Sequence, residues 1–230
     1  MFNLFSKIPM KYNDDEYRVF EISYNDAKPF LLNIHYARKI PTILYAYGLF
    51  KGIKLIGVVT YGMPASPSLC IGVAGEEYKN NVLELNRLVI SPEYSQERNL
   101  ASRLVGKSLK MLPKNYYIVS YADFEGWGHI GYVYQATNWL YTGMSAKRTD
   151  VYVEKGKHSR HYDKDEQRRQ NRTQKHRYIY IVADSKRKRK EMLNKLNYAV
   201  QPYPKGNSVH YDTNNPVAVN SVHLIGDSDV

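Results

Sequence analysis

Residues 90–109, ISPEYSQERNLASRLVGKSL, have the composition of an anion-binding turn. A strand that ends at Ile90 is followed by a polar turn, and then by a helix whose apolar positions begin at Leu100. The unpaired N–H groups of a first helical turn attract negative charge, and the helix dipole adds about half a positive charge. Arg98 adds a full charge just before the helix. The stretch therefore predicts a phosphate-binding turn, and ordinary helix capping is the alternative.

Four residues in and before this turn are candidate ligands or supports of a phosphate. Asn99 can take left-handed backbone angles at modest cost, and Ala101 leaves room for a phosphate against the main chain. Ser102 either binds the phosphate or satisfies the first turn of the helix. Arg87 lies inside an apolar strand, where an unpaired guanidinium is costly. We expect Arg87 to bind a phosphate or carboxylate, or to form a structural ion pair.

A second set of residues could carry acid–base chemistry. Asp123 ends an apolar strand, where a carboxylate can accept a proton from an amine or hydrogen-bond to it, and capping of the next segment is the alternative. His35 and Tyr36 are adjacent and cannot share one helix face, so we expect one to point to the core and the other to a cleft. A His–Asp pair with a tyrosine could hold one iron ion, so His35 and Asp123 are also candidate metal ligands.

Composition restricts the class of protein. The 230 residues are enough for one domain with a core, and 43% of them are hydrophobic. The single cysteine, Cys70, excludes an internal disulfide and a cysteine-based zinc cluster. No run approaches the roughly 20 apolar residues of a membrane span, and the first residues do not resemble a signal peptide. We therefore expect a cytoplasmic protein with no membrane partner.

The net charge of +11 is unevenly distributed. Between Glu154 and Lys195 there are 15 Lys or Arg residues and 6 Asp or Glu residues. Such a density suits a nucleic acid, with affinity that comes from counterion release, and a solvated charged surface is the alternative. The residues that we expect to contact phosphates are Arg168, Arg169, Arg172, Lys175, Arg177, Lys186, Arg187, Lys188, Arg189 and Lys190.

The order of predicted elements indicates a mixed α/β (α+β) fold. Alternating or continuous β-formers predict strands at 17–24, 42–62 (two strands joined at Lys51–Gly52), 82–91, 115–123, 140–155 and 175–184. Helices are expected at 26–41, from residue 100 onward, at 129–139 and at 185–196, with loops at 66–80 and 156–174. We expect an N-terminal lead at 1–16, a core at 17–153, a basic DNA-contacting extension at 154–206 that completes the fold, and an extended tail at 207–230.

The segment V-x-S-P-E-Y…R-N-L-A-S-R-L, which begins at Val89, resembles a signature of the acyl-CoA N-acyltransferase (GNAT) superfamily. In that superfamily the loop holds the cofactor pyrophosphate, and Asn99 and Ala101 stand where glycines are usual. The segment Y-Q-A-T-N-W resembles a second signature, which implies that Tyr134 protonates the departing CoA thiolate. The resemblance implies a GNAT-like mixed sheet flanked by helices, and acetyl-CoA or a related acyl-CoA as cofactor. The implied cofactor-binding residues are Arg87, Leu88, Val89, Ile90, Arg98, Asn99, Leu100, Ala101, Ser102 and Arg103.

Six blocks in one order, from NIHYARKIP to YAVQPYPKG, resemble the Mom family of phage DNA-modification proteins over about residues 17–206. This resemblance implies a transferase that converts the N6 amine of adenine in phage DNA to a carbamoylmethyl (methylcarbamoyl) adduct, which protects the DNA from restriction. Its partners would be double-stranded DNA and a small-molecule donor. The adenine must leave the duplex to react, and Tyr121, Trp127 and Tyr132 are candidates to stack on it.

Two other functions fit the same residues. A conventional acetyl-CoA-dependent N-acetyltransferase would use the same loop and Tyr134 on an amine of a small molecule, a peptide or RNA. A DNA-binding module could keep the fold without catalysis, as the absent glycines would allow.

Overall fold

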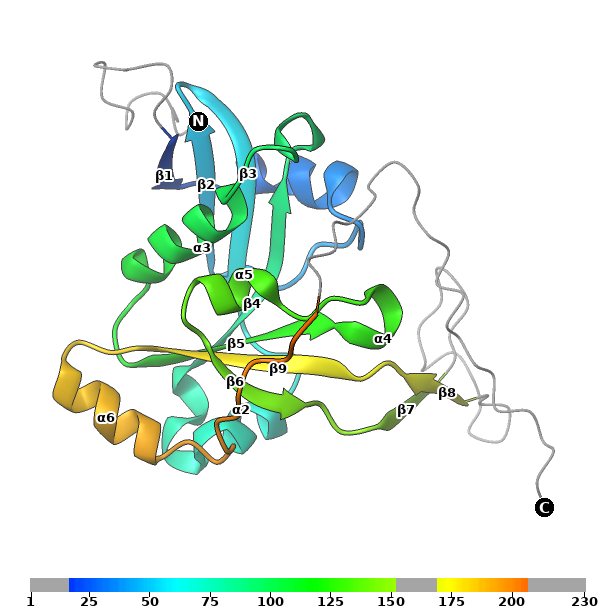
Figure 1. The fold of residues 1–230 in the computed structure, drawn as a ribbon. Helices are drawn as coiled ribbons and strands as arrows, with labels where there is room; N and C mark the ends of the chain where they lie inside the picture. The colour runs from blue at the N-terminus through cyan, green and yellow to red at the C-terminus, as the bar shows by residue number, and fades with distance from the viewer. Residues whose placement is uncertain (1–16, 152–168, 207–230) are drawn as a thin grey trace.

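The computed structural model describes residues 17–151 and 169–206. A seven-stranded mixed sheet forms its centre, with strand order β1-β2-β3-β4-β5-β9-β6 (Figure 1). In that order the strands are β1 (Tyr17–Glu21), β2 (Tyr45–Lys51), β3 (Lys54–Gly62), β4 (Val82–Ile90), β5 (Tyr116–Asp123), β9 (Lys175–Val182) and β6 (Leu140–Met144). The pair β4–β5 is parallel and the others are antiparallel. The expected mixed α/β sheet flanked by helices is confirmed.

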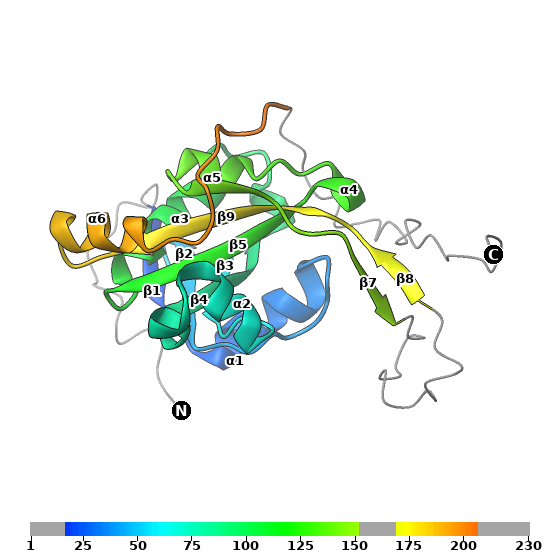
Figure 2. The same cartoon turned by 90° about the horizontal axis from the view of Figure 1, so that it is seen from below.

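Helices cover both faces of this sheet. The α-helices are α1 (Tyr24–Pro29), α2 (Pro67–Ala74), α3 (Leu100–Met111), α4 (Phe124–Trp127), α5 (Tyr132–Ala136) and α6 (Lys186–Asn194). Helices α3 and α5 lie on one face, while α1 and α2 lie on the other (Figure 2). The apolar side of α3 packs into the largest cluster of buried residues, which includes Leu104, Val105 and Tyr134. The position of α3 is therefore fixed by burial of one amphipathic face.

The two parallel strands separate from each other part-way along the sheet. Strand β4 pairs with β5 only over Val82–Glu84, opposite Tyr117–Val119. Beyond Glu84, β4 continues to Ile90 paired with β3, and beyond Val119, β5 continues to Asp123 paired with β9. The facing edges of these two strands diverge in a V (Figure 1). A diverging pair leaves strand edges that can hydrogen-bond to a ligand.

Two predictions about local structure are wrong. The expected helix at 26–41 ends earlier, because a π-helical turn at Phe30–Ile34 leads into extended backbone at His35. The expected loop at 66–80 contains α2, in which Ser66 accepts a hydrogen bond from the Leu69 N–H and Pro67 occupies the first turn. The segment lacks a polar stripe because the exposed positions of α2 include Pro67 and Ile71, so no helical period was visible.

A two-stranded antiparallel ribbon projects from one end of the main sheet (Figures 1 and 2). It consists of β7 (Arg148–Val151) and β8 (Arg169–Arg172). Part of the expected loop at 156–174 is therefore strand. The division of the chain into four segments stays a prediction, and its first and last segments lie outside the described residues. No described helix is long and apolar enough to span a membrane.

Candidate functional site

Tyr134 lies at the point where β4 and β5 separate. Its hydroxyl is 2.8 Å from Ser120 Oγ, which is 2.9 Å from the carbonyl oxygen of Leu85 and donates to it. Leu85 and Ser120 are the first residues beyond the β4–β5 pairing, so the two hydroxyls bridge the base of the V. Tyr134 is buried, and burial raises the pKa of its hydroxyl far above the usual value. Tyr134 is therefore a neutral proton donor at physiological pH.

The loop that follows the π-helical turn brings His35 and Tyr36 to the same region. The two rings stack with centroids 4.4 Å apart, His35 being buried and Tyr36 38% exposed. The charge of Arg87 contributes to lowering the pKa of His35, and Tyr36 contributes to raising the pKa of Tyr134. Arg87 Nε also donates to the carbonyl oxygen of Lys39 at 3.4 Å. The structure thus places His35 and Tyr36 together near Arg87 and Tyr134. The two rings were expected to point apart, one to the core and one to a cleft; His35 is buried and Tyr36 is partly exposed, but the rings stack on each other because the backbone at His35 is extended and not helical.

His35 is held in its neutral form. Its Nδ1 accepts the Ala37 N–H at 3.1 Å, so the proton of the neutral ring is on Nε2. Burial, with the charge of Arg87, lowers the pKa of His35 to about 4.

A pH-dependent loss of stability follows from this shift. Because the pKa of His35 in the unfolded chain is higher than in the folded protein, protonation favours unfolding as pH falls through about 6.5 towards 4. The free energy of unfolding should drop by about 1 kcal/mol between about pH 7 and pH 5.5 from this residue. Urea titrations of wild type and His35→Gln would check this, because the variant should lose that part of the slope. The remaining pH dependence should come from His176, since burial also lowers the pKa of that residue. Equal slopes for both proteins would contradict the assignment.

The turn that was predicted to bind phosphate leads into the start of α3. Asn99 occupies the N-cap with φ 63° and ψ 9°, in the left-handed region, and its side chain does not cap the helix. The first backbone bond of α3 runs from the Arg103 N–H to the Asn99 carbonyl oxygen at 2.8 Å. The N–H groups of residues 100–102 therefore precede the helical hydrogen bonds. Ser102 Oγ donates to the Asn99 carbonyl oxygen at 3.0 Å and stabilises the turn.

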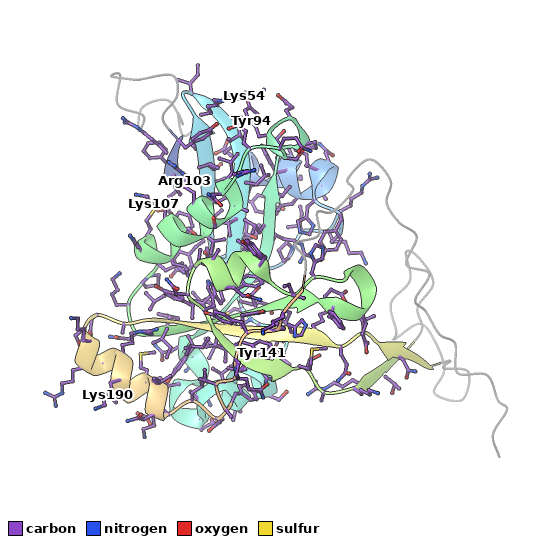
Figure 3. All side chains as sticks on the ribbon, in the orientation of Figure 1. Lys54, Tyr94, Arg103, Lys107, Tyr141 and Lys190 are labelled. Atoms are coloured by element: carbon purple, nitrogen blue, oxygen red, sulfur yellow. The ribbon has the colours of Figure 1, made fainter. Side chains whose placement is uncertain are left out.

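A basic groove begins at this turn and runs between α3 and α5. Its volume is about 610 Å³. The charged side chains that line it are Arg103, Lys107 and Lys110, and the lining residues include no acidic one. Arg103 and Lys107 lie along α3 in Figure 3. The groove suits a ligand that carries several negative charges.

Some of the expected cofactor ligands offer only their backbone. Leu100 and Val89 are buried in apolar clusters, so their side chains cannot reach a ligand. Asn99, Ser102 and Arg103 line the groove. The left-handed backbone of Asn99 agrees with the conformational freedom expected of asparagine, and a role of Asn99, Ser102 and Arg103 in cofactor binding stays a prediction.

Asp123 stands at the end of β5, next to the ribbon. Its carboxylate lies 3.6 Å from Lys175 Nζ and accepts a hydrogen bond from Thr173 Oγ1 at 3.4 Å. Its side chain is 14% exposed, so it is largely shielded from water. Among residues 17–151 and 169–206, no group of three or more His, Cys, Asp or Glu side chains could hold a metal ion. The expectation of iron at His35 and Asp123 is not supported.

The basic residues expected to contact DNA fall into two groups. Arg169, Arg172 and Lys175 belong to the ribbon and the start of β9, whereas Lys186–Lys190 belong to α6 at the other end of β9. The eight residues of β9 separate the groups by roughly 25 Å. The residues expected to contact DNA therefore lie at the two ends of β9, and their contact with DNA stays a prediction. Arg168 lies outside the described residues.

Arg177 is a structural residue. Its guanidinium lies 3.4 Å from the centre of the Tyr198 ring and donates to the Thr142 carbonyl oxygen at 2.8 Å. These contacts occupy the side chain of Arg177, which was expected to contact DNA phosphates. Of the candidate stacking rings, Tyr132 is 60% exposed and Tyr121 packs against a core cluster.

Sequence reasoning missed several residues of the site. Lys107 and Lys110 follow Arg103 at helical spacing, a signal that was present on the polar side of α3. Gly106 also lines the groove, opposite Thr137 of the segment after α5. Ser120 carried no signal, because a serine inside an apolar strand gains meaning only when Leu85 and Tyr134 are placed beside it.

The chain matches the model of the Mom protein family over residues 16–205. Methylcarbamoylase Mom of Escherichia phage Mu is 30% identical over 211 residues, which cover 84% of this chain and 86% of that protein. Among solved structures, an N-acetyltransferase from Staphylococcus aureus Mu50 is 13% identical with a TM-score of 0.42, covering 73% of this chain and 99% of its own. A Salmonella typhimurium protein solved with its cofactor acetyl-CoA is 8% identical with a TM-score of 0.45, covering 74% of this chain and 96% of its own. The protein described here belongs to the Mom protein family.

Proposed function

We propose that this protein is a transferase that modifies the N6 amine of adenine in phage DNA to a carbamoylmethyl adduct, in the host cytoplasm, and so protects the DNA from restriction. Family membership supports this proposal, because the relative from phage Mu is named a methylcarbamoylase. The observation that carries it is the neutral, buried Tyr134 at the base of the V, beside a basic groove. This arrangement combines a proton donor with a site for a phosphorylated cofactor.

An acyl-CoA fits the groove by its charge. Its diphosphate would lie at the N–H groups of residues 100–102, and Arg103 and Lys107 would balance its negative charge. The edge of β4 beyond Glu84 would hydrogen-bond the amide-containing arm of the cofactor. When bound, the thioester would supply an activated carbonyl carbon: attack by an amine nitrogen forms an amide bond and releases the CoA thiolate. In the carbamoylmethyl adduct this amide is the terminal carboxamide, so thiolate release belongs to the formation of that bond, and the bond between N6 and the methylene carbon forms in a separate step.

Tyr134 would supply the proton that a departing thiolate needs. The hydroxyl of Tyr134 is protonated at neutral pH, and burial raises its pKa further above the usual value. Ser120 has one hydroxyl hydrogen and two acceptors within reach, the Leu85 carbonyl oxygen and the Tyr134 oxygen. Ser120 can therefore turn from Leu85 to Tyr134 and stabilise the tyrosinate that proton transfer leaves.

The side of the site formed by His35 and Tyr36 would receive the adenine. The stacked pair of rings has one partly exposed member, Tyr36, on which a flipped base can stack. Asp123, on the strand that carries Ser120, would accept a hydrogen bond from the adenine amine. Arg148 of the ribbon and the exposed lysines and arginines of α6 would contact DNA phosphates.

Mass spectrometry of nucleosides tests the proposed function. DNA from cells that produce the protein should contain carbamoylmethyl adenine, and DNA from cells with the empty vector should not. Acetylated amines in RNA, peptides or metabolites without an adenine adduct would instead indicate a conventional acetyltransferase. Unmodified adenine with no acetylated product would indicate a binding module.

A further inference from the structure

The ribbon formed by β7 and β8 is firmly attached at its base. Ser145 and Lys175 exchange hydrogen bonds, with Ser145 N–H donating to the Lys175 carbonyl oxygen at 2.8 Å and Lys175 N–H donating to Ser145 Oγ at 3.0 Å. The side chain of Gln174 donates to the Ser145 carbonyl oxygen at 2.9 Å. Its backbone N–H donates to Glu125 Oε2 of α4 at 2.6 Å. These bonds fix the direction in which the ribbon leaves the sheet.

The residues at the attachment point of the ribbon also contact Asp123, whose carboxylate is proposed to accept a hydrogen bond from the adenine amine. Thr173 and Lys175, which directly follow β8, both bond to its Oδ2. The position of the ribbon is therefore tied to the end of β5 in the V. Whatever the ribbon binds is held next to the proposed adenine site.

The ribbon has the composition of a polyanion-binding element. Residues 145–151 and 169–175 contain five Lys or Arg residues and one Asp. Lys147, Arg148, Thr149 and Asn171 are exposed. A two-stranded ribbon is marginally stable alone in water, so contacts with a bound partner would stabilise it.

We propose that this ribbon enters the major groove of duplex DNA next to the adenine that is modified. This rests on the proposed function. The major groove is wide enough for a two-stranded ribbon, and the N6 amine of adenine lies in that groove. Thr149 pairs with Asn171 in the ribbon, so a hydroxyl and an amide share one face. Asparagine can bond to N6 and N7 of an adenine edge, which gives the ribbon a means to read sequence beside the target.

Binding to two duplexes of one sequence tests the proposal. One duplex is unmodified, and the other carries glucosylated 5-hydroxymethylcytosine, whose sugar fills the major groove. Fluorescence anisotropy with full-length protein should show affinity for the glucosylated duplex that is at least about tenfold weaker, the size of one lost bidentate base contact. Netropsin, which occupies the minor groove, should change the affinity for unmodified DNA less than about twofold.

A double substitution connects this preference to the ribbon. Arg148→Ala/Asn171→Ala should bind the unmodified duplex about tenfold more weakly and should lose most of the preference between the two duplexes. The matched control is Arg189→Ala/Asn194→Ala on α6, which removes the same residue types from exposed positions. This control should keep the full preference for the unmodified duplex over the glucosylated one, even if its affinity for both falls because phosphate contacts are lost.

Two results would overturn the proposal: equal wild-type affinity for both duplexes, or an unchanged preference in the ribbon variant. The proposed function fails separately, by the absence of the adenine adduct in cells. A preference for the unmodified duplex without that adduct would support the ribbon's role and reject the enzyme activity. If the adenine adduct were made by a protein that binds both duplexes equally, the enzyme activity would be supported and the ribbon's role would be rejected.

Discussion

Replacing Tyr134 with phenylalanine is expected to slow adenine modification at least about a hundredfold, the usual contribution of a positioned general acid. The phenyl ring keeps the packing of Tyr134 against Trp139 and Tyr178, whose centroids lie 5.0 and 5.1 Å away. Only the hydroxyl at the base of the V is removed, and with it the proton for the departing thiolate. The adduct content of cellular DNA, measured as a fraction of adenine, gives the rate.

The stability of this variant should change little. Ser120 can still donate to the Leu85 carbonyl oxygen, so no buried donor loses its partner. The loss of one hydrogen bond should cost about 1 kcal/mol in the free energy of unfolding. Affinity for CoA and for DNA should match wild type, which separates a chemical defect from a binding defect. Wild-type adduct levels in Tyr134→Phe would exclude Tyr134 as the acid.

Ser120→Ala tests the hydrogen bond between Ser120 and Tyr134. It leaves the Tyr134 hydroxyl in place but removes the group proposed to stabilise the tyrosinate. A smaller loss of rate, about tenfold, is expected from one lost hydrogen bond to a charged oxygen. A loss as large as that of Tyr134→Phe would mean that Ser120 itself transfers the proton.

The elements that could be predicted from sequence are those whose burial follows one simple period. Helix α3 alternates Leu104 and Leu109 with exposed lysines, and β4 reads as a nearly continuous apolar strand. Helix α2 could not be found this way, because its exposed positions include Pro67 and Ile71 and a polar stripe is missing. The ribbon strand β8 could not be found either, since the polar, charged sequence RQNR has no apolar alternation.

The candidate site was predictable only as separate parts. The left-handed turn at Asn99 follows from local chemistry, because asparagine takes that conformation at modest cost. The bonds of Arg177 to Thr142 and Tyr198 depend on tertiary contacts that charge alone does not reveal. The same holds for the separation of Lys175 from Lys186, since the straight course of β9 puts neighbours in sequence at opposite ends of the sheet.

Gly106 offers a sharp test of the cofactor groove. A leucine at this position would extend from α3 into the groove that Gly106 lines together with Thr137. We expect Gly106→Leu to weaken CoA binding by about a hundredfold, because filling a pocket removes contacts and excludes the ligand. Calorimetric titration of the purified protein with CoA measures the affinity.

Gly106→Ala is the matched control for this substitution. A methyl group at Gly106 would lie 3.7 Å from Thr137 Cγ2, an ordinary van der Waals contact, so alanine fits without displacing a neighbour. It should bind CoA within about threefold of wild type and stabilise α3 by about 0.5–1 kcal/mol, since alanine favours a helix interior over glycine. Thermal unfolding of both variants shows whether Gly106→Leu is folded when its affinity is measured. If folded Gly106→Leu bound CoA as tightly as Gly106→Ala, the cofactor would have to lie outside the groove, and Arg103 and Lys107 would lose their proposed role.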